Sequence, residues 1–193
     1  MTGEAPPRKR LFFGIWPDVE TRRALRKATR DAVHSAGGKP VPPDNLHLTL
    51  AFLHSVEHAR LDCIGHAAAG LRAPAFEIAI DRIGYWPRSR VLWAAPGRPP
   101  AALHELVAGL WAALEPCGFA PEQRAYLPHV TLARKAAPPK QTGPMPAIAW
   151  RSESFALAES ITGCNRSVYH RLEEWPLQAK GHRGQIPGSD PCG

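Results

Sequence analysis

The chain of 193 residues contains the tetrapeptide His-x-Thr-Leu twice, as His47-Leu48-Thr49-Leu50 and as His129-Val130-Thr131-Leu132. In both copies apolar residues alternate with polar ones, which is typical of a strand with one buried face. Because side chains alternate between the two faces of a strand, the His and the Thr of each copy share the face opposite the apolar residues. Each copy therefore presents one imidazole and one hydroxyl side by side.

Two such strands facing each other across a groove would bring together two imidazoles and two hydroxyls. A pair of imidazoles can supply a general base and a general acid at the same pH. The hydroxyls can donate hydrogen bonds to phosphate oxygens as negative charge develops on them. This set fits in-line displacement at phosphorus. One isolated His-x-Thr is usually structural, whereas two copies on alternating strands favour a shared site.

Other kinds of site fit the sequence less well. No Asp or Glu accompanies the histidines on these strand faces, so the pattern of a 2-His-carboxylate metal site or a zinc protease is missing. The Gly-rich loop that binds nucleoside triphosphates is also missing. We therefore expect no metal or other cofactor. A strained substrate with a built-in leaving group, such as a cyclic phosphodiester, suits this chemistry best.

Composition favours a soluble protein with an anionic partner. Hydrophobic residues make up 44% and charged residues 21% of the chain, as in ordinary globular proteins. The formal net charge of +7 favours nucleic acid or a nucleotide as partner. No apolar run approaches the roughly 18 residues of a membrane helix, and the N-terminus does not resemble a signal peptide. We expect a cytoplasmic monomer with no membrane contact.

The cysteines support the same location. Their spacing includes no C-x-x-C pair, so neither a zinc knuckle nor a redox motif is indicated. We expect reduced, mostly structural thiols, as is usual in the cytoplasm. The four positions are Cys63, Cys117, Cys164 and Cys192.

The strands that carry the motifs alternate with helical segments. Asp18 is a predicted N-cap of the first helix and Gly37-Gly38 its end, while Ser55 is a predicted cap of the second. The expected elements, in chain order, are a strand (10–16), a helix (19–36), the first motif strand (45–53), a helix (56–71), a strand (75–81), two strand pieces around 87–89, a helix (100–115), the second motif strand (128–135), a Pro-rich loop (136–147) and a closing strand pair.

This order predicts an α+β protein of antiparallel strands with helices on one face. We expect a single domain over 9–180, with flexible tails at 1–8 and 181–193. Each half offers a helix followed by a His-x-Thr-Leu strand, although the halves are otherwise unlike in sequence. A structural pseudo-two-fold is therefore expected, and a tandem array is not.

Over residues 9–178 the chain resembles the two-histidine phosphoesterase superfamily. Within it, the chain is similar to the bacterial and archaeal RNA 2′,3′-cyclic phosphodiesterases, also called 2′-5′ RNA ligases. The segments that carry the resemblance are KRLFFGIWP, NLHLTLAFL, RVLWAAP, PEQRAYLPHVTLAR and FALAESITGCNRSVYHRLEEWPL.

The resemblance implies two pseudo-symmetric lobes of antiparallel sheet with outer helices and a central groove. It implies hydrolysis of a terminal 2′,3′-cyclic phosphate on RNA to a 2′-phosphate, with possible reverse 2′-5′ ligation, and no metal or ATP. The residues that match the family's positions are His47 and His129 as the catalytic pair, Thr49 and Thr131 as phosphate-holding hydroxyls, Arg134 and Arg124 as substrate-binding arginines, and Phe52 as a base-stacking aromatic.

Two of these matches conflict with strict alternation along a strand. Arg134 would lie on the Val130 face, so it can reach the groove only if the strand ends or bulges before it. Phe52 shares its parity with the leucines of the first motif, so a core position is an equally good interpretation. As a hypothesis on roles, His129 activates water and His47 protonates the departing 3′-oxygen, although the expected symmetry makes the two interchangeable.

Two alternatives remain open. The groove could serve a non-catalytic module that binds RNA or nucleotides, or a phosphodiesterase for 2′-5′ oligonucleotides, a small cyclic nucleotide or ADP-ribose cyclic phosphate. Among the other residues, His170 lies on a late strand and could face the groove. Trp86, Trp93 and Trp111 are predicted to belong mainly to the core, although Tyr85-Trp86 could contact a base.

Overall fold

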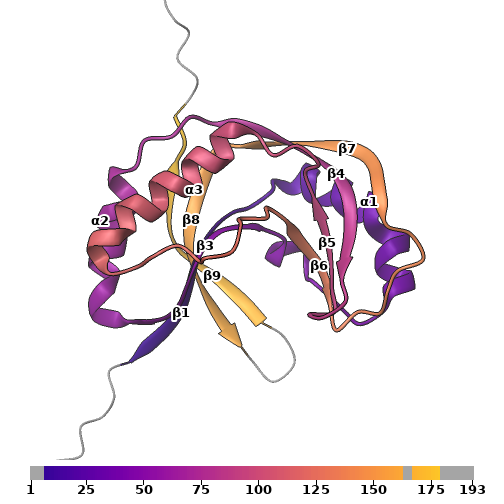
Figure 1. The fold of residues 1–193 in the computed structure, drawn as a ribbon, viewed down its shortest axis with the longest axis horizontal. Helices are drawn as coiled ribbons and strands as arrows, with labels where there is room; N and C mark the ends of the chain where they lie inside the picture. The colour runs from indigo at the N-terminus through magenta and orange to yellow at the C-terminus, as the bar shows by residue number, and fades with distance from the viewer. Residues whose placement is uncertain (1–6, 163–166, 179–193) are drawn as a thin grey trace, which may run out of the picture.

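One large antiparallel sheet forms the centre of the molecule (Figure 1). The structure is a computed structural model that describes residues 7–162 and 167–178. Within these ranges the sheet has nine strands, of which eight follow in the order β7-β4-β5-β6-β3-β1-β8-β9 while β2 pairs with β6. The strands are β1 (Arg8–Ile15), β2 (Lys39–Pro40), β3 (Leu48–Glu57), β4 (Phe76–Trp86), β5 (Val91–Ala95), β6 (Val130–Arg134), β7 (Gly143–Ser152), β8 (Ser154–Thr162) and β9 (Ser167–Pro176).

The sheet consists of two lobes that meet at β3 and β6. One lobe contains β3-β1-β8-β9 and the other β6-β5-β4-β7, so each lobe has one of the two motif strands innermost, at the junction. The two lobes pair through a single position, Leu48 opposite Val130, and both of these side chains are fully buried. The predicted α+β class with a large antiparallel sheet is thus confirmed.

Three α-helices cover the sheet: α1 (Val19–Ala36), α2 (Leu61–Gly70) and α3 (Ala101–Leu114). Although α1 directly follows β1, it packs against β5, β6 and β7 of the other lobe. The helices α2 and α3 pack against each other over the lobe of β3 and β9, on the opposite side of the molecule from α1 (Figure 1). This crossing of α1 ties the two halves of the chain together.

The ends of α1 confirm the prediction made from its capping residues. The side chain of Asp18 accepts a hydrogen bond from the Thr21 amide at 2.7 Å, which satisfies one free donor of the first turn. At the other end, Gly37 has a φ of 58° and its amide donates to the Val33 carbonyl. Glycine adopts this conformation at little cost, so the helix stops there.

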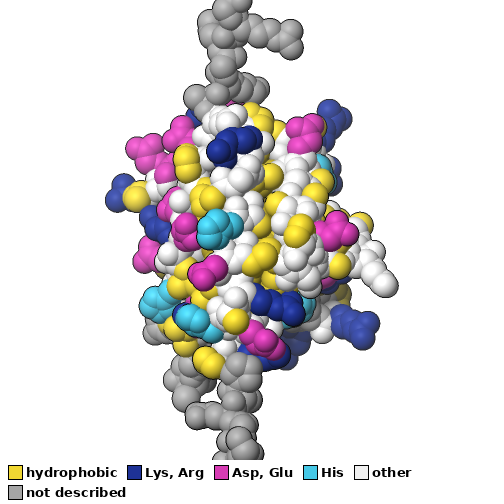
Figure 2. Space-filling model, turned by 90° about the vertical axis from the view of Figure 1, so that its left-hand side faces the viewer, with side chains coloured by type: hydrophobic (Ala, Val, Ile, Leu, Met, Phe, Trp, Pro, Cys, Tyr) yellow, Lys and Arg dark blue, Asp and Glu magenta, His cyan; other side chains and the backbone are white. Residues whose placement is uncertain are grey.

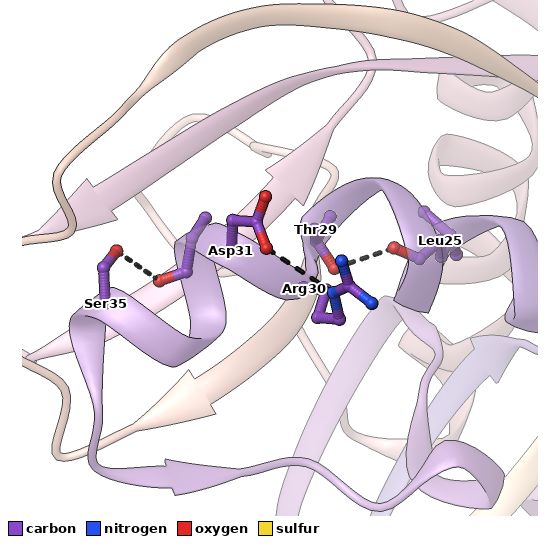
Figure 3. Close-up of polar contacts among 6 residues, drawn as sticks. Leu25, Thr29, Arg30, Asp31 and Ser35 are labelled. Carbon is purple, nitrogen blue, oxygen red and sulfur yellow. Dashed lines mark hydrogen bonds and ion pairs between the residues drawn. The ribbon is translucent and has the colours of Figure 1, made fainter.

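The faces of α1 differ as the helical spacing requires. Leu25 and Thr29 are buried, and the Thr29 hydroxyl donates to the Leu25 carbonyl at 2.7 Å (Figure 3). This bond keeps a buried hydroxyl satisfied. Ser35 donates to a carbonyl one turn earlier, and Arg30 donates to its neighbour Asp31 on the exposed side (Figure 3).

The second predicted helix begins later than expected. β3 continues through Ser55 to Glu57 because it pairs with β1, Ser55 lying opposite Arg10. A short 3₁₀ turn (His58–Arg60) follows, and α2 starts only at Leu61. The prediction that Ser55 caps a helix is therefore wrong, because a tertiary strand partner extends β3 past the residue whose local chemistry favours a cap.

Two other boundaries also differ from the sequence prediction. The expected strand at 75–81 and the piece after it form the single strand β4. The expected loop 136–147 ends early, since β7 starts at Gly143 and pairs with β4. β7 is an edge strand, where Pro144 and Pro146 can be accommodated because a missing amide donor can face away from the sheet.

The prediction of reduced thiols is wrong for one pair of cysteines. Cys63 of α2 and Cys117, in the 3₁₀ turn that follows α3 (Glu115–Cys117), form a disulfide with a Cα–Cα distance of 5.9 Å. Their wide separation in the sequence hid this proximity, which depends on how α2 packs on α3. The other two cysteines lie outside the described residues.

The start of β1 corrects the boundary of the predicted N-terminal tail. Arg8, expected in the N-terminal tail, is the first residue of β1 and forms an ion pair with Glu57. The expected C-terminal tail, 181–193, lies outside the described residues. No helix in the described ranges is long and apolar enough to cross a membrane.

Candidate active site

The pairing of Leu48 with Val130 brings the two motifs together. In an antiparallel register the neighbours of a paired position also lie opposite each other, and they point to the other face. With Leu48 opposite Val130, His47 comes beside Thr131 and Thr49 beside His129. All four polar side chains thus share one face at the lobe junction, while the two apolar residues between them are buried on the other.

Both imidazoles are held by the same kind of hydrogen bond. Nδ1 of His47 lies 2.7 Å from the carbonyl of Asn45, and Nδ1 of His129 lies 2.8 Å from the carbonyl of Leu127. A carbonyl can only accept, so each Nδ1 carries the proton and each neutral ring keeps its lone pair on Nε2. Nε2 of His47 is 3.1 Å from the Thr49 hydroxyl, which can donate to it. Both rings therefore have the same tautomer.

The surroundings keep both imidazoles neutral. Burial lowers the pKa of His47 to about 4, and the hydrogen bond to Asn45 only partly opposes this. Burial likewise lowers the pKa of His129, against the opposing effect of its hydrogen bond to Leu127. The positive charge of Arg134 lowers both pKa values further, so this guanidinium lies close enough to act on both rings. The free protein thus holds two neutral bases and one cation.

A β-bulge follows the threonine in each motif. The register of β1 with β3 skips Leu50, and the register of β5 with β6 skips Leu132. These are the same positions of the two tetrapeptides. An extra residue on one strand shifts the alternation beyond it, so side chains past the bulge change faces. The two bulges therefore re-aim the residues that follow the motifs.

The bulges resolve both conflicts of parity. Arg134 pairs with Val91 beyond the Leu132 bulge, which returns it to the face of Thr131. Phe52, beyond the Leu50 bulge, is half-buried and stacks on Phe12 with 6.4 Å between ring centroids. Since the ring of Phe12 lies 4.8 Å from that of His47, Phe52 belongs to the His47 side of the sheet. Its alternative interpretation as a core residue is not supported.

Arg124 lies at the margin of the site. Its side chain is 83% exposed and forms an ion pair with Glu122 at 2.5 Å. Its charge still contributes to the lowered pKa of His129, so it is near this ring but not beside His47. Of the two arginines expected to bind substrate, Arg134 is thus the central one.

Three aromatic residues around His47 were not predicted. Trp16 stacks on the imidazole with a centroid distance of 5.3 Å and an interplanar angle of 24°. Tyr169 of β9 meets the ring edge-on at 4.9 Å, and Phe12 of β1 packs at 4.8 Å. The sequence places these residues far from the first motif, and only the strand order β3-β1-β8-β9 brings them beside it. His170, next to Tyr169, is exposed, and alternation along β9 points it away from His47.

The second imidazole also has an aromatic neighbour. Trp86 packs edge-on against His129 at 4.6 Å, with Trp93 5.4 Å from Trp86. A core role for Trp86 is therefore wrong, because it is half-buried beside the site. Trp93 lies over Gly84, where a Cβ atom would come within 2.0 Å of the indole. Glycine is needed there to let the indole lie flat on the strand.

Tyr126 connects the two motifs directly. It precedes His129 by three residues, and its hydroxyl donates a hydrogen bond to the Thr49 carbonyl at 2.9 Å. Burial raises the pKa of its phenol, so the hydroxyl remains a donor throughout the ordinary pH range. The contact joins the segment before β6 to the strand that carries the first motif.

The described residues include no group of three or more His, Cys, Asp or Glu side chains close enough to hold a metal ion. The site instead contains two imidazoles, two hydroxyls and one guanidinium. Such a set can move protons on either side of an anionic centre and stabilise the charge between them.

Comparison with known proteins identifies the family. Residues 15–93 match the family described as LigT like Phosphoesterase. The RNA 2′,3′-cyclic phosphodiesterase of Escherichia coli (strain K12) is 34% identical to this chain over 171 residues, covering 88% of the chain and 97% of that protein. The chain belongs to the LigT-like phosphoesterases. It is an enzyme of the two-histidine superfamily, as its motifs predicted.

Other LigT-like phosphoesterases agree over nearly the whole chain. The RNA 2′,3′-cyclic phosphodiesterase of Thermus thermophilus is 33% identical over 201 residues, covering 95% of this chain and 99% of that protein. The crystal structure of E. coli LigT complexed with 3′-AMP has a TM-score of 0.80 at 33% identity, covering 89% of this chain and 99% of that one. The LigT-like fold thus covers most of this chain.

Proposed function

We propose that this LigT-like phosphoesterase hydrolyses the terminal 2′,3′-cyclic phosphate of RNA to a 2′-phosphate, with no cofactor. One observation carries the proposal: His47 and His129, in the same tautomer, lie on one face at the lobe junction with two threonine hydroxyls. The names of the E. coli and T. thermophilus relatives, and the 3′-AMP complex of E. coli LigT, support the same substrate class.

The geometry supplies each part of an in-line displacement. One Nε2 accepts a proton from water as its oxygen bonds to phosphorus, and the other imidazole donates a proton to the 3′-oxygen as the bond from phosphorus to that oxygen breaks. Thr49, Thr131 and Arg134 hold the non-bridging oxygens, whose negative charge they stabilise. Because the two rings come from two strands that meet at the pair Leu48–Val130, base and acid can act on opposite sides of the phosphorus.

The aromatic residues distinguish the two histidines. Phe12, Trp16 and Tyr169 surround His47, whereas His129 has Trp86. A nucleoside stacked on the richer side places its ribose, and therefore the departing 3′-oxygen, next to His47. His47 is then the acid and His129 the base. The low pKa of His47 belongs to the free protein, and the negative charge of a bound phosphodiester raises it.

Turnover in the presence of EDTA tests this proposal. The pure protein is incubated with RNA ending in 2′,3′-cyclic phosphate, and the terminal phosphate is then located. We expect a 2′-phosphate as the product. His47→Ala and His129→Ala should each form it at least about a thousandfold more slowly, since each variant loses one of the two groups that transfer a proton. His66→Ala, which alters an exposed histidine of α2, should turn over normally.

Several outcomes would contradict it. Near-normal turnover in either active-site variant would refute the paired acid–base scheme. Binding of RNA without hydrolysis would favour the non-catalytic module, and hydrolysis of only a 2′-5′ linkage or a small cyclic nucleotide would assign another substrate.

If the 5′-hydroxyl of RNA takes the place of water, the same residues would form a 2′-5′ bond, and we propose this reverse reaction as a second activity of the site.

We also propose that the enzyme acts as a monomer in the cytoplasm. A reducing cytoplasm opposes a bond such as that between Cys63 and Cys117. Localisation is therefore best measured together with the redox state of this pair, by trapping free thiols in intact cells before lysis.

A further inference from the structure

Aromatic contacts connect His47 to Arg10 across the face of the sheet that carries both motifs. The ring centroids of His47 and Phe12 are 4.8 Å apart, and those of Phe12 and Phe52 are 6.4 Å apart. Phe52 in turn contacts His54 edge-on at 4.6 Å and Arg10, whose guanidinium carbon lies 4.8 Å from the centre of the Phe52 ring. Arg10 and Phe12 are two residues apart on β1, so they share one face of this strand.

Arg10 differs from the other basic residues of β1. Arg8 forms an ion pair with Glu57, and Lys9 with Glu159 at 2.7 Å. Arg10 is exposed, and among the described residues it forms no ion pair with a carboxylate. A guanidinium that contacts a ring still has N–H groups that can bind a ligand, and their spacing matches two oxygens of a phosphate.

The other exposed surroundings of the site are less suited to a phosphate. Arg171 lies 5.8 Å from the ring of Trp16, but its charge is shared with Glu174. Arg124, on the His129 side, is paired with Glu122. On the outer face of the molecule around α2, acidic and basic side chains are mixed (Figure 2). An unpaired cation stacked on an aromatic ring beside the site is thus found at Arg10.

Aromatic rings next to a cation are the usual means of holding single-stranded nucleic acid, because bases stack on the rings while the cation binds the backbone. We propose that Arg10 binds the phosphodiester immediately 5′ of the terminal nucleotide when the terminal base lies over Phe52. The enzyme then selects RNA ends of two or more nucleotides over a mononucleoside 2′,3′-cyclic phosphate. This inference rests on the proposed function, whose substrate class it narrows.

The test compares a mononucleoside 2′,3′-cyclic phosphate with a trinucleotide that ends in the same cyclic phosphate. The wild-type enzyme should have the higher kcat/KM on the trinucleotide. Arg10→Ala should reduce this preference by about three- to tenfold, the effect of losing one exposed charge-assisted contact. It should also reduce the salt dependence of kcat/KM on the trinucleotide, by roughly 0.7 in the slope of log kcat/KM against log salt. Arg10→Lys should retain most of the salt dependence of kcat/KM on the trinucleotide. It should retain less of the preference for the trinucleotide over the mononucleoside substrate.

Two matched variants serve as controls. Arg30→Ala removes an exposed arginine of α1 that is paired with Asp31, so neither the preference nor the salt slope should change. Arg171→Ala removes the arginine that lies over the ring of Trp16, and a loss of preference there but not in Arg10→Ala would overturn the assignment. Equal kcat/KM on both substrates would overturn the inference and leave the proposed function intact. Failure of the wild-type enzyme to hydrolyse either substrate would overturn both.

Discussion

At the scale of single residues, the site depends on two imidazoles that share one cation. Burial and Arg134 lower the pKa of both His47 and His129, so the free enzyme favours two neutral rings. The proposed mechanism needs one neutral ring and one protonated ring. This form of the pair is most abundant between its two apparent pKa values, which belong to the pair as a whole.

The pH dependence of kcat/KM follows from these values. Since both pKa values are lowered from about 6.5, kcat/KM for a nucleoside 2′,3′-cyclic phosphate should peak below pH 6.5. It falls at higher pH as the acid loses its proton, and at lower pH as the base gains one. Arg134→Gln removes a positive charge, so both apparent pKa values should rise and the peak should move to higher pH.

Steady-state rates from about pH 4 to about pH 9 measure this profile. Arg124→Gln is the matched comparison, because Arg124 is named among the causes of the lowered pKa of His129 only, whereas Arg134 lowers the pKa of both rings. Since the Arg124 side chain is also 83% exposed, this variant should shift the profile less than Arg134→Gln does. A wild-type maximum above pH 7, or an Arg134→Gln profile shifted to lower pH, would contradict the electrostatic account.

At the scale of elements, the decisive features are the bulges at Leu50 and Leu132. Strict alternation predicted the face of each His-x-Thr pair, but it placed Phe52 and Arg134 on the wrong side. A bulge depends on how a strand pairs with its neighbour, and that partner lies elsewhere in the chain. The same limit explains β3, which its pairing with β1 extends through the predicted cap at Ser55.

The contact between Gly84 of β4 and Trp93 of β5 allows a test at this scale. Gly84→Ala would place a Cβ atom 2.0 Å from the indole, so Trp93 must move, and with it Trp86, which packs on His129. We expect a loss of about 1–3 kcal/mol in the free energy of unfolding, as for other overpacked sites, together with a lower kcat.

Urea denaturation and steady-state kinetics measure the two effects. Gly70→Ala is the control, since a Cβ atom at this position in α2 meets nothing within 4 Å, and alanine should leave stability unchanged or raise it slightly. An unchanged stability and kcat in Gly84→Ala would show that the indole moves aside freely. It would also show that Trp93 does not help to hold Trp86 beside His129.

At the scale of the whole molecule, the two lobes are joined by few but specific connections. The sheet continues from one lobe to the other through one residue pair, α1 crosses to the far lobe, and Tyr126 bonds to the Thr49 carbonyl. The disulfide between Cys63 and Cys117 lies within one lobe, where it joins α2 to the end of α3.

This bond should stabilise the fold without taking part in the chemistry. A disulfide restricts the unfolded chain, and a bridge between residues 54 positions apart should contribute about 2–4 kcal/mol to the free energy of unfolding. A reductant should therefore lower the urea midpoint of the wild-type protein. The double variant Cys63→Ala/Cys117→Ala should start lower and show no response to the reductant. An equal response in both proteins would show that the bond is absent in solution.

The sequence by itself determined the chemistry and the fold class. The repeated His-x-Thr-Leu, its strand alternation and the caps of α1 are local features, and local patterns fix which side chains share a face and where a helix begins. The tertiary structure decided which distant segments contact one another. It set Leu48 against Val130, brought Trp16 and Tyr169 to His47, introduced the bulges that re-aim Arg134 and Phe52, and joined Cys63 to Cys117. These contacts depend on pairing and packing between distant segments, which no local pattern of residues records.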